Sequence, residues 1–457
     1  MASSLITSWN PEDRAFWQAE GKAVATRNLW LSIPALFLSF AVWMVWSVVI
    51  VRLPEVGFRY TTDQLFWLAA LPGLSGATLR IFYAFVVPIF GGRLWTALST
   101  ASLLVPALGI GFAVQDPSTS YGTMLLLALL CGLGGGNFAS SMSNISFFFP
   151  KAQKGTALGL NAGLGNLGVS AMQFVIPLVV TVGAFGALGG APQPLVDGRG
   201  GHLWLQNAGF VWVPFILTSA VAAWFGMNDL ATAKASFRDQ AVVFRRKHNW
   251  LMCWLYLGTF GSFIGYSAGL PLLVKSQFPG VDPVRYAFLG PLVGALARPV
   301  GGWLADRLGG ARVTFWNFVA MSAAAMGVLA FLPAGGQGGS FAGFLAMFLV
   351  LFATSGIGNG STFRMIPVIF ATFHERLAPP SAADAAKRDA AKEAAAVIGF
   401  SSAIAAYGAF FIPRAFGIAV RATGTPSAAF LAFVAVYASC VAVTWWFYAR
   451  RKAEMPC

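Results

Sequence analysis

Two arginines lie in apolar segments that have no acidic residue nearby to neutralise them. Arg80 ends the stretch LPGLSGATLR (71–80), and Arg298 ends LGPLVGALAR (289–298). A charged side chain near the middle of a bilayer costs about 2.5–3.5 kcal/mol or more, so such residues are candidates for a functional site. All sixteen Asp and Glu fall in loops, tails or the ends of apolar segments, so we expect no buried carboxylate. The counter-charge is therefore expected to arrive from outside the chain, as an anionic substrate.

The composition is that of a membrane protein along the whole chain. Of the 457 residues, 57% are hydrophobic and 10% are charged, whereas a soluble domain carries about 25% charged residues. The net charge of +14 is spread over short loops and forms no basic stripe, which argues against nucleic-acid binding. The four cysteines show no paired spacing, so neither disulfides nor a metal site are predicted.

Twelve apolar segments are long enough to cross a bilayer, which takes roughly 20 residues. They are residues 29–51, 63–90, 94–114, 121–148, 155–182, 207–227, 249–274, 285–305, 313–333, 340–369, 394–416 and 426–448. This pattern predicts an all-α integral membrane protein. The expected parts are a tail (1–28), a six-helix half (29–228), a linker (229–248), a second half (249–449) and a tail (450–457). Basic residues concentrate on the side that carries both termini, so the positive-inside rule predicts cytoplasmic termini.

The two halves repeat a motif at a constant spacing. Leu71, Leu74, Gly76, Ala77 and Arg80 recur as Leu289, Leu292, Gly294, Ala295 and Arg298. The segment GLGGG (132–136) also corresponds to GIGNG (356–360). Related six-helix halves are typical of carriers that work by alternating access, with a site near the midplane at the interface of the halves. The repeat therefore predicts that both arginines face that site.

The segment after the eighth span resembles the loop signature of the major facilitator superfamily. The matching residues are Gly302, Asp306, Arg307, Gly309 and Arg312. Within that superfamily, the chain is similar to nitrate/nitrite porters of the NarK type, from SWNPEDRAFW (8–17) to the last span. The glycine signature of that family stands in the fifth span as Gly159, Gly163, Gly165, Asn166 and Gly168. The resemblance implies a fold of twelve helices in two pseudo-symmetric halves.

The resemblance also implies a set of site residues. Those expected to bind substrate are Arg80, Arg298, Phe138, Phe260, Tyr256, Asn166 and Ser402. Those expected to serve conformational change are Gly159, Gly163, Gly165, Gly168, Asp306 and Arg307. The chemistry is suitable, because a guanidinium is planar and can donate to two oxygens of a planar anion at once. Aromatic rings above and below the anion would fix its plane and exclude water.

Each of these residues also has a purely structural interpretation. Arg80 and Arg298 could each pair with a backbone carbonyl or reach the headgroups. Reaching the headgroups or lining a vestibule is the favoured interpretation for Arg364 near the end of the tenth span. Glycine clusters let membrane helices approach closely without touching a substrate, and Asn166 could instead bond between helices. With 41 Phe in the chain, most aromatic side chains must simply pack in the core or face lipid.

The mode of coupling is inferred from the titratable residues. Proton-driven carriers generally use Asp, Glu or His inside the membrane, yet His202, His248 and His374 all fall in predicted loops. We expect an antiporter that imports nitrate in exchange for nitrite, because two facing arginines repel each other until an anion binds. The alternatives are a proton- or sodium-coupled nitrate/nitrite importer, a carrier of another small anion, and a channel or sensor.

The remaining expectations concern context. We expect a multi-pass protein of the bacterial inner membrane that works as a monomer. Its partners are expected to be nitrate, nitrite and the lipid bilayer. No cofactor is expected, and no nucleophile–base or metal constellation indicates an enzyme.

Overall fold

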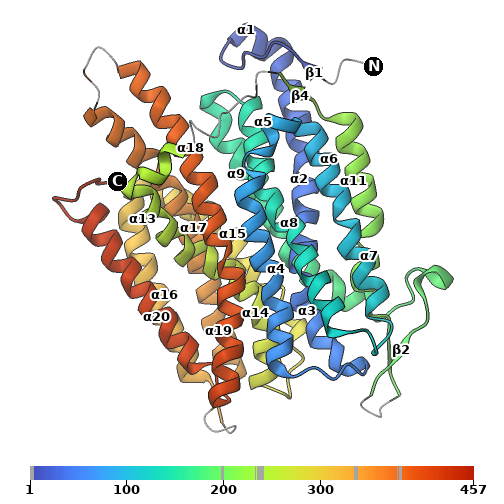
Figure 1. The fold of residues 1–457 in the computed structure, drawn as a ribbon. Helices are drawn as coiled ribbons and strands as arrows, with labels where there is room; N and C mark the ends of the chain where they lie inside the picture. The colour runs from blue at the N-terminus through green and yellow to red at the C-terminus, as the bar shows by residue number, and fades with distance from the viewer. Residues whose placement is uncertain are drawn as a thin grey trace. The chain divides into compact units, whose positions relative to one another are not determined.

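The structure is a computed structural model that describes residues 5–196, 200–231, 233, 241–333, 338–377, 379 and 383–457. Within these residues, twelve helical segments are long and apolar enough to cross a membrane, which confirms the predicted all-α fold with twelve spans (Figure 1). They are Arg14–Val56, Thr62–Tyr83, Gly92–Ala113, Tyr121–Phe148, Lys151–Val179, Asn207–Gly226, Lys247–Gln277, Pro283–Leu308, Gly310–Phe331, Phe341–Leu377, Ala385–Thr423 and Ser427–Ala449.

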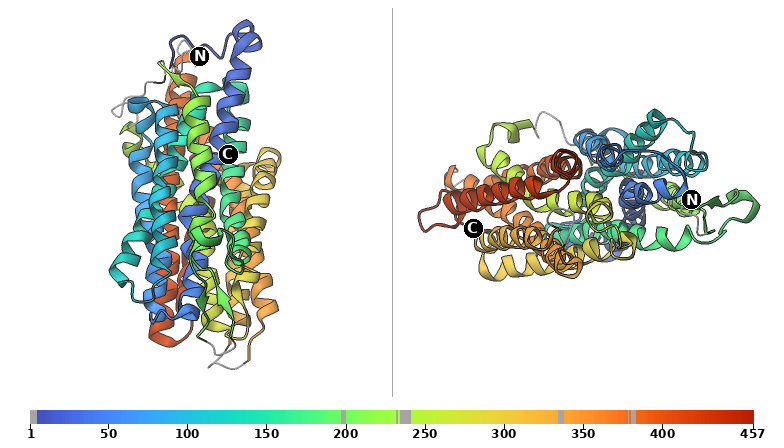
Figure 2. Two further views of the ribbon diagram at one scale, coloured as in Figure 1. Left: turned by 90° about the vertical axis from the view of Figure 1, so that its right-hand side faces the viewer. Right: turned by 90° about the horizontal axis from the view of Figure 1, so that it is seen from below.

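The chain divides into two compact units. Figure 2 shows the helices from two further sides. Unit 1 comprises Met1–Lys234 and Ser267–Phe288, and unit 2 comprises Ala235–Tyr266 and Leu289–Cys457. The helix α14 (Ser262–Gln277) begins in unit 2 and ends in unit 1. The division into halves at 29–228 and 249–449 remains a prediction. Residues 232 and 234–240 of the predicted linker lie outside the described residues.

Unit 1 is built from helices joined by short connections. Its main helices are α2 (Lys22–Met44), α3 (Trp46–Arg52), α4 (Thr62–Tyr83), α6 (Gly92–Ser102), α7 (Leu104–Ala113), α8 (Tyr121–Phe148), α9 (Lys151–Val179) and α11 (Val213–Gly226). The shorter helical elements are α1 (Arg14–Phe16), η1 (Trp17–Gly21), η2 (Leu53–Val56), α5 (Val86–Phe90), η3 (Gly186–Gly189), α10 (Asn207–Phe210) and η6 (Pro283–Arg285). The short strands β1 (Leu5–Ile6) and β4 (Asp229–Leu230) pair in parallel, and β2 (Gln193–Pro194) and β3 (His202–Leu203) pair antiparallel. Polar caps begin several helices, as in the capping box of Thr61 and Gln64 at α4.

Unit 2 contains the remaining spans. Its helices are α13 (Lys247–Tyr256), α15 (Leu289–Leu308), α16 (Gly310–Phe331), α17 (Phe341–Leu377), α18 (Ala383–Ala406), α19 (Gly408–Thr423) and α20 (Ser427–Thr444), with the shorter elements η4 (Ala241–Arg245), η5 (Leu257–Gly261) and η8 (Trp445–Ala449). The repeat is visible in its packing, because α15 packs along α17 as α4 packs along α8 in unit 1.

Glycines of the repeated motif permit these two equivalent crossings. A Cβ built on Gly76 of α4 would lie 3.1 Å from the Cα of Gly135 in α8. A Cβ on Gly356 of α17 would lie 2.1 Å from the carbonyl oxygen of Gly294 in α15. Small residues let membrane helices approach this closely, so the structural interpretation of these glycines holds within each unit.

The expectation that no carboxylate is buried is wrong for Glu393, because this residue is only 8% exposed. Glu393 lies in the alanine-rich segment 371–395, whose charge pattern predicts a solvated cytoplasmic helix. Its residues from Ala383 onward form the start of α18, where the helical spacing of the charges leaves one face for packing. Ala386, Ala390 and Glu393 fall on that buried face. The carboxylate is neutralised by Arg246, whose Nη2 and Nε donate to Glu393 at 2.7 and 2.9 Å.

The placements of His248 and His374 in loops are also wrong, and His374 lies in the last turn of α17. His248 is the more deeply buried of the two. It lies in the first turn of α13 and is 5% exposed. Its Nδ1 lies 3.0 Å from the hydroxyl of Tyr448 and its Nε2 lies 3.3 Å from Glu454. These polar partners on neighbouring elements offset the free-energy cost of burying the imidazole ring. No local sequence pattern reveals them.

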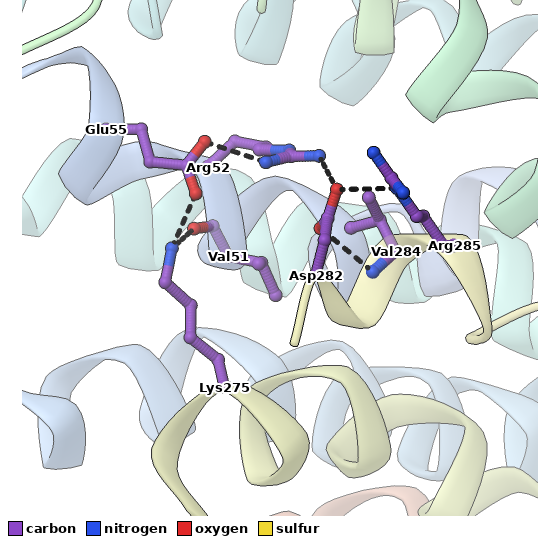
Figure 3. Close-up of polar contacts among 7 residues, drawn as sticks. All are labelled: Val51, Arg52, Glu55, Lys275, Asp282, Val284 and Arg285. Atoms are coloured by element: carbon purple, nitrogen blue, oxygen red, sulfur yellow. Dashed lines mark hydrogen bonds and ion pairs between the residues drawn. The ribbon is translucent and has the colours of Figure 1, made fainter. Parts of the chain in front are cut away.

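A network of ion pairs links α3 to the end of α14 within unit 1 (Figure 3). Arg52 donates to Glu55 at 2.8 Å and to Asp282 at 2.9 Å. Lys275 donates to Glu55 at 2.8 Å and also to the carbonyl oxygen of Val51. Each carboxylate is therefore shared between basic groups, which fastens the end of α14 to α3 and η2.

Removing Asp282 from this network tests its contribution to stability. Asp282→Asn is expected to lower the free energy of unfolding by about 1 kcal/mol, because a half-buried guanidinium loses one of its two partners. Thermal unfolding of the detergent-solubilised protein measures the effect. The matched control is Arg285→Gln, since the Arg285 side chain is 77% exposed and lies 3.7 Å from Asp282. Equal losses in both variants would contradict the expected role of Arg52.

Candidate anion-binding residues in the two units

In unit 1, Arg80 is wholly buried in the last turn of α4. Its Nε donates to the carbonyl oxygen of Gly135 in α8 at 2.9 Å. The guanidinium carbon lies 4.8 Å from the ring centroid of Phe138 and 5.1 Å from that of Trp43. Cation–π attraction stabilises a guanidinium beside aromatic rings. Because the guanidinium is planar, its remaining N–H groups keep fixed directions in which they can donate to a ligand.

The local sequence explains how this arrangement forms. Glycines at 76 and 135 bring α4 and α8 together, which places a backbone carbonyl of α8 within reach of Arg80. Phe138 follows Gly135 by about one helical turn, so its ring lies on the same side of α8. Trp43 is fixed from α2 by a hydrogen bond of 2.6 Å from its Nε1 to the carbonyl oxygen of Pro72.

The residues of the glycine signature in α9 divide into two groups. A Cβ on Gly168 would lie 2.1 Å from the carbonyl oxygen of Phe37, and one on Gly165 would lie 2.7 Å from Leu36. A Cβ on Gly159 or Gly163 would meet no atom of the described residues within 4 Å. Only Gly165 and Gly168 are therefore needed for the close approach of α9 to α2.

Asn166 lies within that signature and is 1% exposed. Among the described residues, its side-chain Oδ1 has no hydrogen-bond partner. A buried amide without a full set of partners is costly, and its N–H groups can donate to an anion.

In unit 2, Arg298 is half-buried in α15. Its Nη2 lies 3.4 Å from the hydroxyl of Tyr256, and its guanidinium carbon lies 5.4 Å from the ring centroid of Phe363. Within the part of the chain that the structure describes, its Nη1 is buried without a hydrogen-bond partner. A buried guanidinium nitrogen without a partner is able to donate a hydrogen bond to an anion.

Tyr256 and Phe260 are both fully buried in the seventh span. Their rings stack at 5.5 Å between centroids with an interplanar angle of 16°. Phe260 lies in η5, a π-helical turn, and such turns occur often at functional sites because they re-aim side chains. The phenyl ring therefore stacks on the tyrosine ring whose hydroxyl contacts Arg298.

Ser402 and the loop signature lie elsewhere in unit 2. Ser402 is buried in α18, where its hydroxyl donates to the carbonyl oxygen of Gly399 at 2.8 Å. Asp306 pairs with Arg364 of α17, and Arg307 lies 4.2 Å from the ring centroid of Trp303. Arg364 therefore belongs to the Asp306 ion pair, a partner that the sequence did not identify.

Sequence reasoning missed two aromatic residues, Trp43 and Phe363, which face the two candidate arginines. Trp43 lies in the first span, which carries no copy of the repeated motif. Phe363 directly precedes Arg364 in the segment GNGSTFRMIPVIF, but one more Phe among 41 carries no local signal. The available signal for Phe363 was its position in a segment that resembles the family.

Comparisons with known proteins identify the family. The family model described as Major Facilitator Superfamily matches residues 35–387. The nitrate/nitrite transporter NarU of Salmonella typhimurium is 52% identical over 455 residues, which cover 98% of this chain and 97% of that protein. The probable nitrate/nitrite antiporter NarK2 of Thermus thermophilus is 45% identical, covering 99% and 98%.

A solved structure shows the same fold at low sequence identity. It is a bacterial homologue of the human lysosomal transporter Spinster in an inward-facing, unoccupied conformation. The identity is 17% and the TM-score 0.58, over 93% of this chain and 94% of that one. The relatives are transporters, which confirms that the chain is not an enzyme, and it is a multi-pass protein of the bacterial inner membrane. The chain belongs to the nitrate/nitrite porter family of the major facilitator superfamily, as its motifs predicted.

Proposed function

We propose that this protein imports nitrate in exchange for nitrite by alternating access. The observation that carries the proposal is the environment of the two arginines, which occupy equivalent positions of the repeat and each face an aromatic ring. The names of the relatives at 52% and 45% identity support nitrate and nitrite as the anions.

In this proposal, Arg80 and Arg298 bind the oxygens of the anion from their respective halves. Phe138 and Phe260 bound the site with aromatic faces, which favours a flat anion over tetrahedral phosphate or sulfate. Tyr256 orients Arg298 through the contact at 3.4 Å. The polar contacts are assigned to Asn166 and Ser402. The glycines of the signature and the Asp306 loop serve the change of conformation.

The exchange mechanism follows from charge. An empty site that holds two guanidinium groups resists closure, because the like charges repel each other in a medium of low dielectric constant. One bound anion reduces this repulsion and permits the carrier to reorient. Nitrate carried inward must then be replaced by nitrite before the site can return. We further propose that the carrier works as a monomer with both termini in the cytoplasm.

A second candidate function is proton-coupled uptake, because the structure contains a carboxylate and a histidine in contact. The Nε2 of His374 lies 3.3 Å from Glu393. However, both oxygens of Glu393 already accept hydrogen bonds from Arg246. Protonating this carboxylate would disrupt that pair, so we favour a structural role for it.

Counterflow in proteoliposomes tests the exchange proposal. Vesicles are loaded with nitrite, phosphate, formate or no anion, and labelled nitrate is added outside. Rapid uptake is expected only with nitrite, or with nitrate itself, inside. Equal uptake with formate or phosphate inside would indicate a carrier of another anion. Flux that does not depend on the internal anion would indicate a channel.

Trp43 is expected to support anion binding through Arg80. Trp43→Leu should weaken nitrate affinity by about 2- to 30-fold, because the desolvated cation–π contact contributes about 0.5–2 kcal/mol to holding the guanidinium. Nitrate titration of the purified carrier by calorimetry measures the affinity. Trp303→Leu is the control, since that exposed indole faces Arg307 instead. Unchanged affinity in Trp43→Leu would remove Trp43 from the site.

A further inference from the structure

Unit 2 contains a basic pocket that the proposed transport site does not use. Its volume is about 240 Å³, and its polar lining consists of Arg245, Arg246, Lys247, His248 and Glu454. Apolar side chains of α17, including Phe373, form the opposite wall. We propose that this pocket binds the phosphate of an anionic phospholipid headgroup.

The lining carries more positive than negative charge. Arg246 is neutralised by Glu393, and Lys247 is paired with Glu454 at 2.6 Å. Arg245 lies at the end of η4 with an exposed side chain, and it forms no ion pair with any described residue. Arg245 therefore remains available to an incoming anion. It lies next to Arg246, which uses only some of its N–H donors for Glu393.

The pocket already stabilises an oxyanion that belongs to the chain itself. The carboxylate of Glu454 lies 2.6 Å from Lys247 and 3.3 Å from His248. The hydrogen bond from Lys247 lowers the pKa of the Glu454 carboxyl. A phosphate group offers oxygen acceptors of the same kind, so it can bind Arg245 and the part of Arg246 that Glu393 leaves free, beside the Lys247–Glu454 pair.

The surroundings favour a lipid over free phosphate. Phe244, Trp250 and Trp446 are 38%, 50% and 52% exposed. Trp250 donates to the carbonyl oxygen of Phe244, and Arg450 lies 4.1 Å from the ring centroid of Trp446. Exposed aromatic residues beside basic ones mark the level of the headgroups, and basic pockets between membrane helices bind anionic headgroups there.

The size of the pocket agrees with this ligand. Its volume of about 240 Å³ is many times the roughly 10–15 Å³ of such space that one water molecule needs. A phosphodiester with its glycerol fits such a space, and the Phe373 wall suits the apolar carbons next to the glycerol. The C-terminal segment contributes to the enclosure, since Arg376 donates to the carbonyl oxygen of Glu454 at 2.6 Å.

Native mass spectrometry of the full chain in neutral detergent tests the proposal. Phosphatidylglycerol is expected to bind at a concentration several-fold lower than phosphatidylcholine. Arg245→Gln should weaken phosphatidylglycerol binding by about fivefold, because a basic residue near an anionic lipid contributes about 1 kcal/mol. The matched control is Arg285→Gln, another exposed arginine, which should bind as the wild type does. Thermal unfolding of each variant checks that the fold is intact.

This experiment uses no nitrate, so its outcome does not depend on whether the transport proposal is correct. Equal binding of the two lipids, or equal weakening in the two variants, would overturn the lipid site. A third arm adds about 10 mM inorganic phosphate, which would saturate a site with a Kd of about 1 mM. If phosphate alone removed the phosphatidylglycerol, the pocket would be a site for a soluble anion and the lipid assignment would be wrong.

Discussion

Arg80→Lys is expected to reduce nitrate–nitrite exchange by about 100-fold. Arg80 uses Nε for the carbonyl oxygen of Gly135 and lies against the ring of Phe138. A lysine has no planar fork, so it cannot hold this position and also donate to two oxygens of the anion. Losing a hydrogen bond to a charged group costs about 1.5–3 kcal/mol, and about 2.7 kcal/mol corresponds to 100-fold. The initial rate of labelled nitrate uptake into nitrite-loaded vesicles measures the change.

Two further variants separate this effect from a general loss of charge or fold. Arg285→Lys keeps the charge at an exposed position and should exchange at the wild-type rate. Arg298→Lys should fall as steeply as Arg80→Lys, and its half-buried position makes it less sensitive to misfolding. If both lysine variants folded and kept more than half of the activity, the arginines would not be the anion ligands.

Two substitutions in the same glycine signature are expected to have opposite effects on stability. Gly168→Ala would place its Cβ 2.1 Å from the carbonyl oxygen of Phe37, and backbone cannot move aside as a flexible side chain can. Overpacking of this kind costs about 1–3 kcal/mol. Gly163→Ala meets no described atom within 4 Å and should gain up to about 1 kcal/mol from the better helix propensity of alanine.

Thermal unfolding of the two alanine variants in detergent distinguishes these expectations. The transition of Gly168→Ala should lie below that of the wild type, and the transition of Gly163→Ala at or above it. A stable Gly163→Ala variant that no longer exchanges anions would assign Gly163 to the conformational cycle. Equal destabilisation of both would contradict the division of the signature into contact and open positions.

The fold and the family were predictable because they depend on features that are local in the sequence. The length of each apolar run determines the number of spans, and the motif shared by Arg80 and Arg298 reveals the repeat. The glycines of the signature carried the family resemblance. The packing consequences of Gly76 and Gly294 also follow from residue size, since only small side chains allow such close crossings.

The partners of the arginines were not predictable, because they come from distant parts of the chain. Trp43 reaches Arg80 from α2, and nothing in its own segment indicates that contact. Glu393 was misjudged for the same reason, since its burial depends on Arg246, which is 147 residues away in sequence. Charge pattern alone suggested a solvated segment, whereas the long-range ion pair permits the carboxylate to be buried.

The central claim is that anion exchange, and not a proton gradient, drives nitrate across the membrane. The most direct measurement follows labelled nitrate and internal pH together in proteoliposomes, with and without internal nitrite and with and without an imposed pH gradient. In vesicles that contain no nitrate, we expect uptake to require internal nitrite and to leave internal pH unchanged. Uptake into vesicles without nitrite, driven by the gradient and accompanied by acidification, would contradict it and would make Glu393 and His374 the residues to examine as proton carriers.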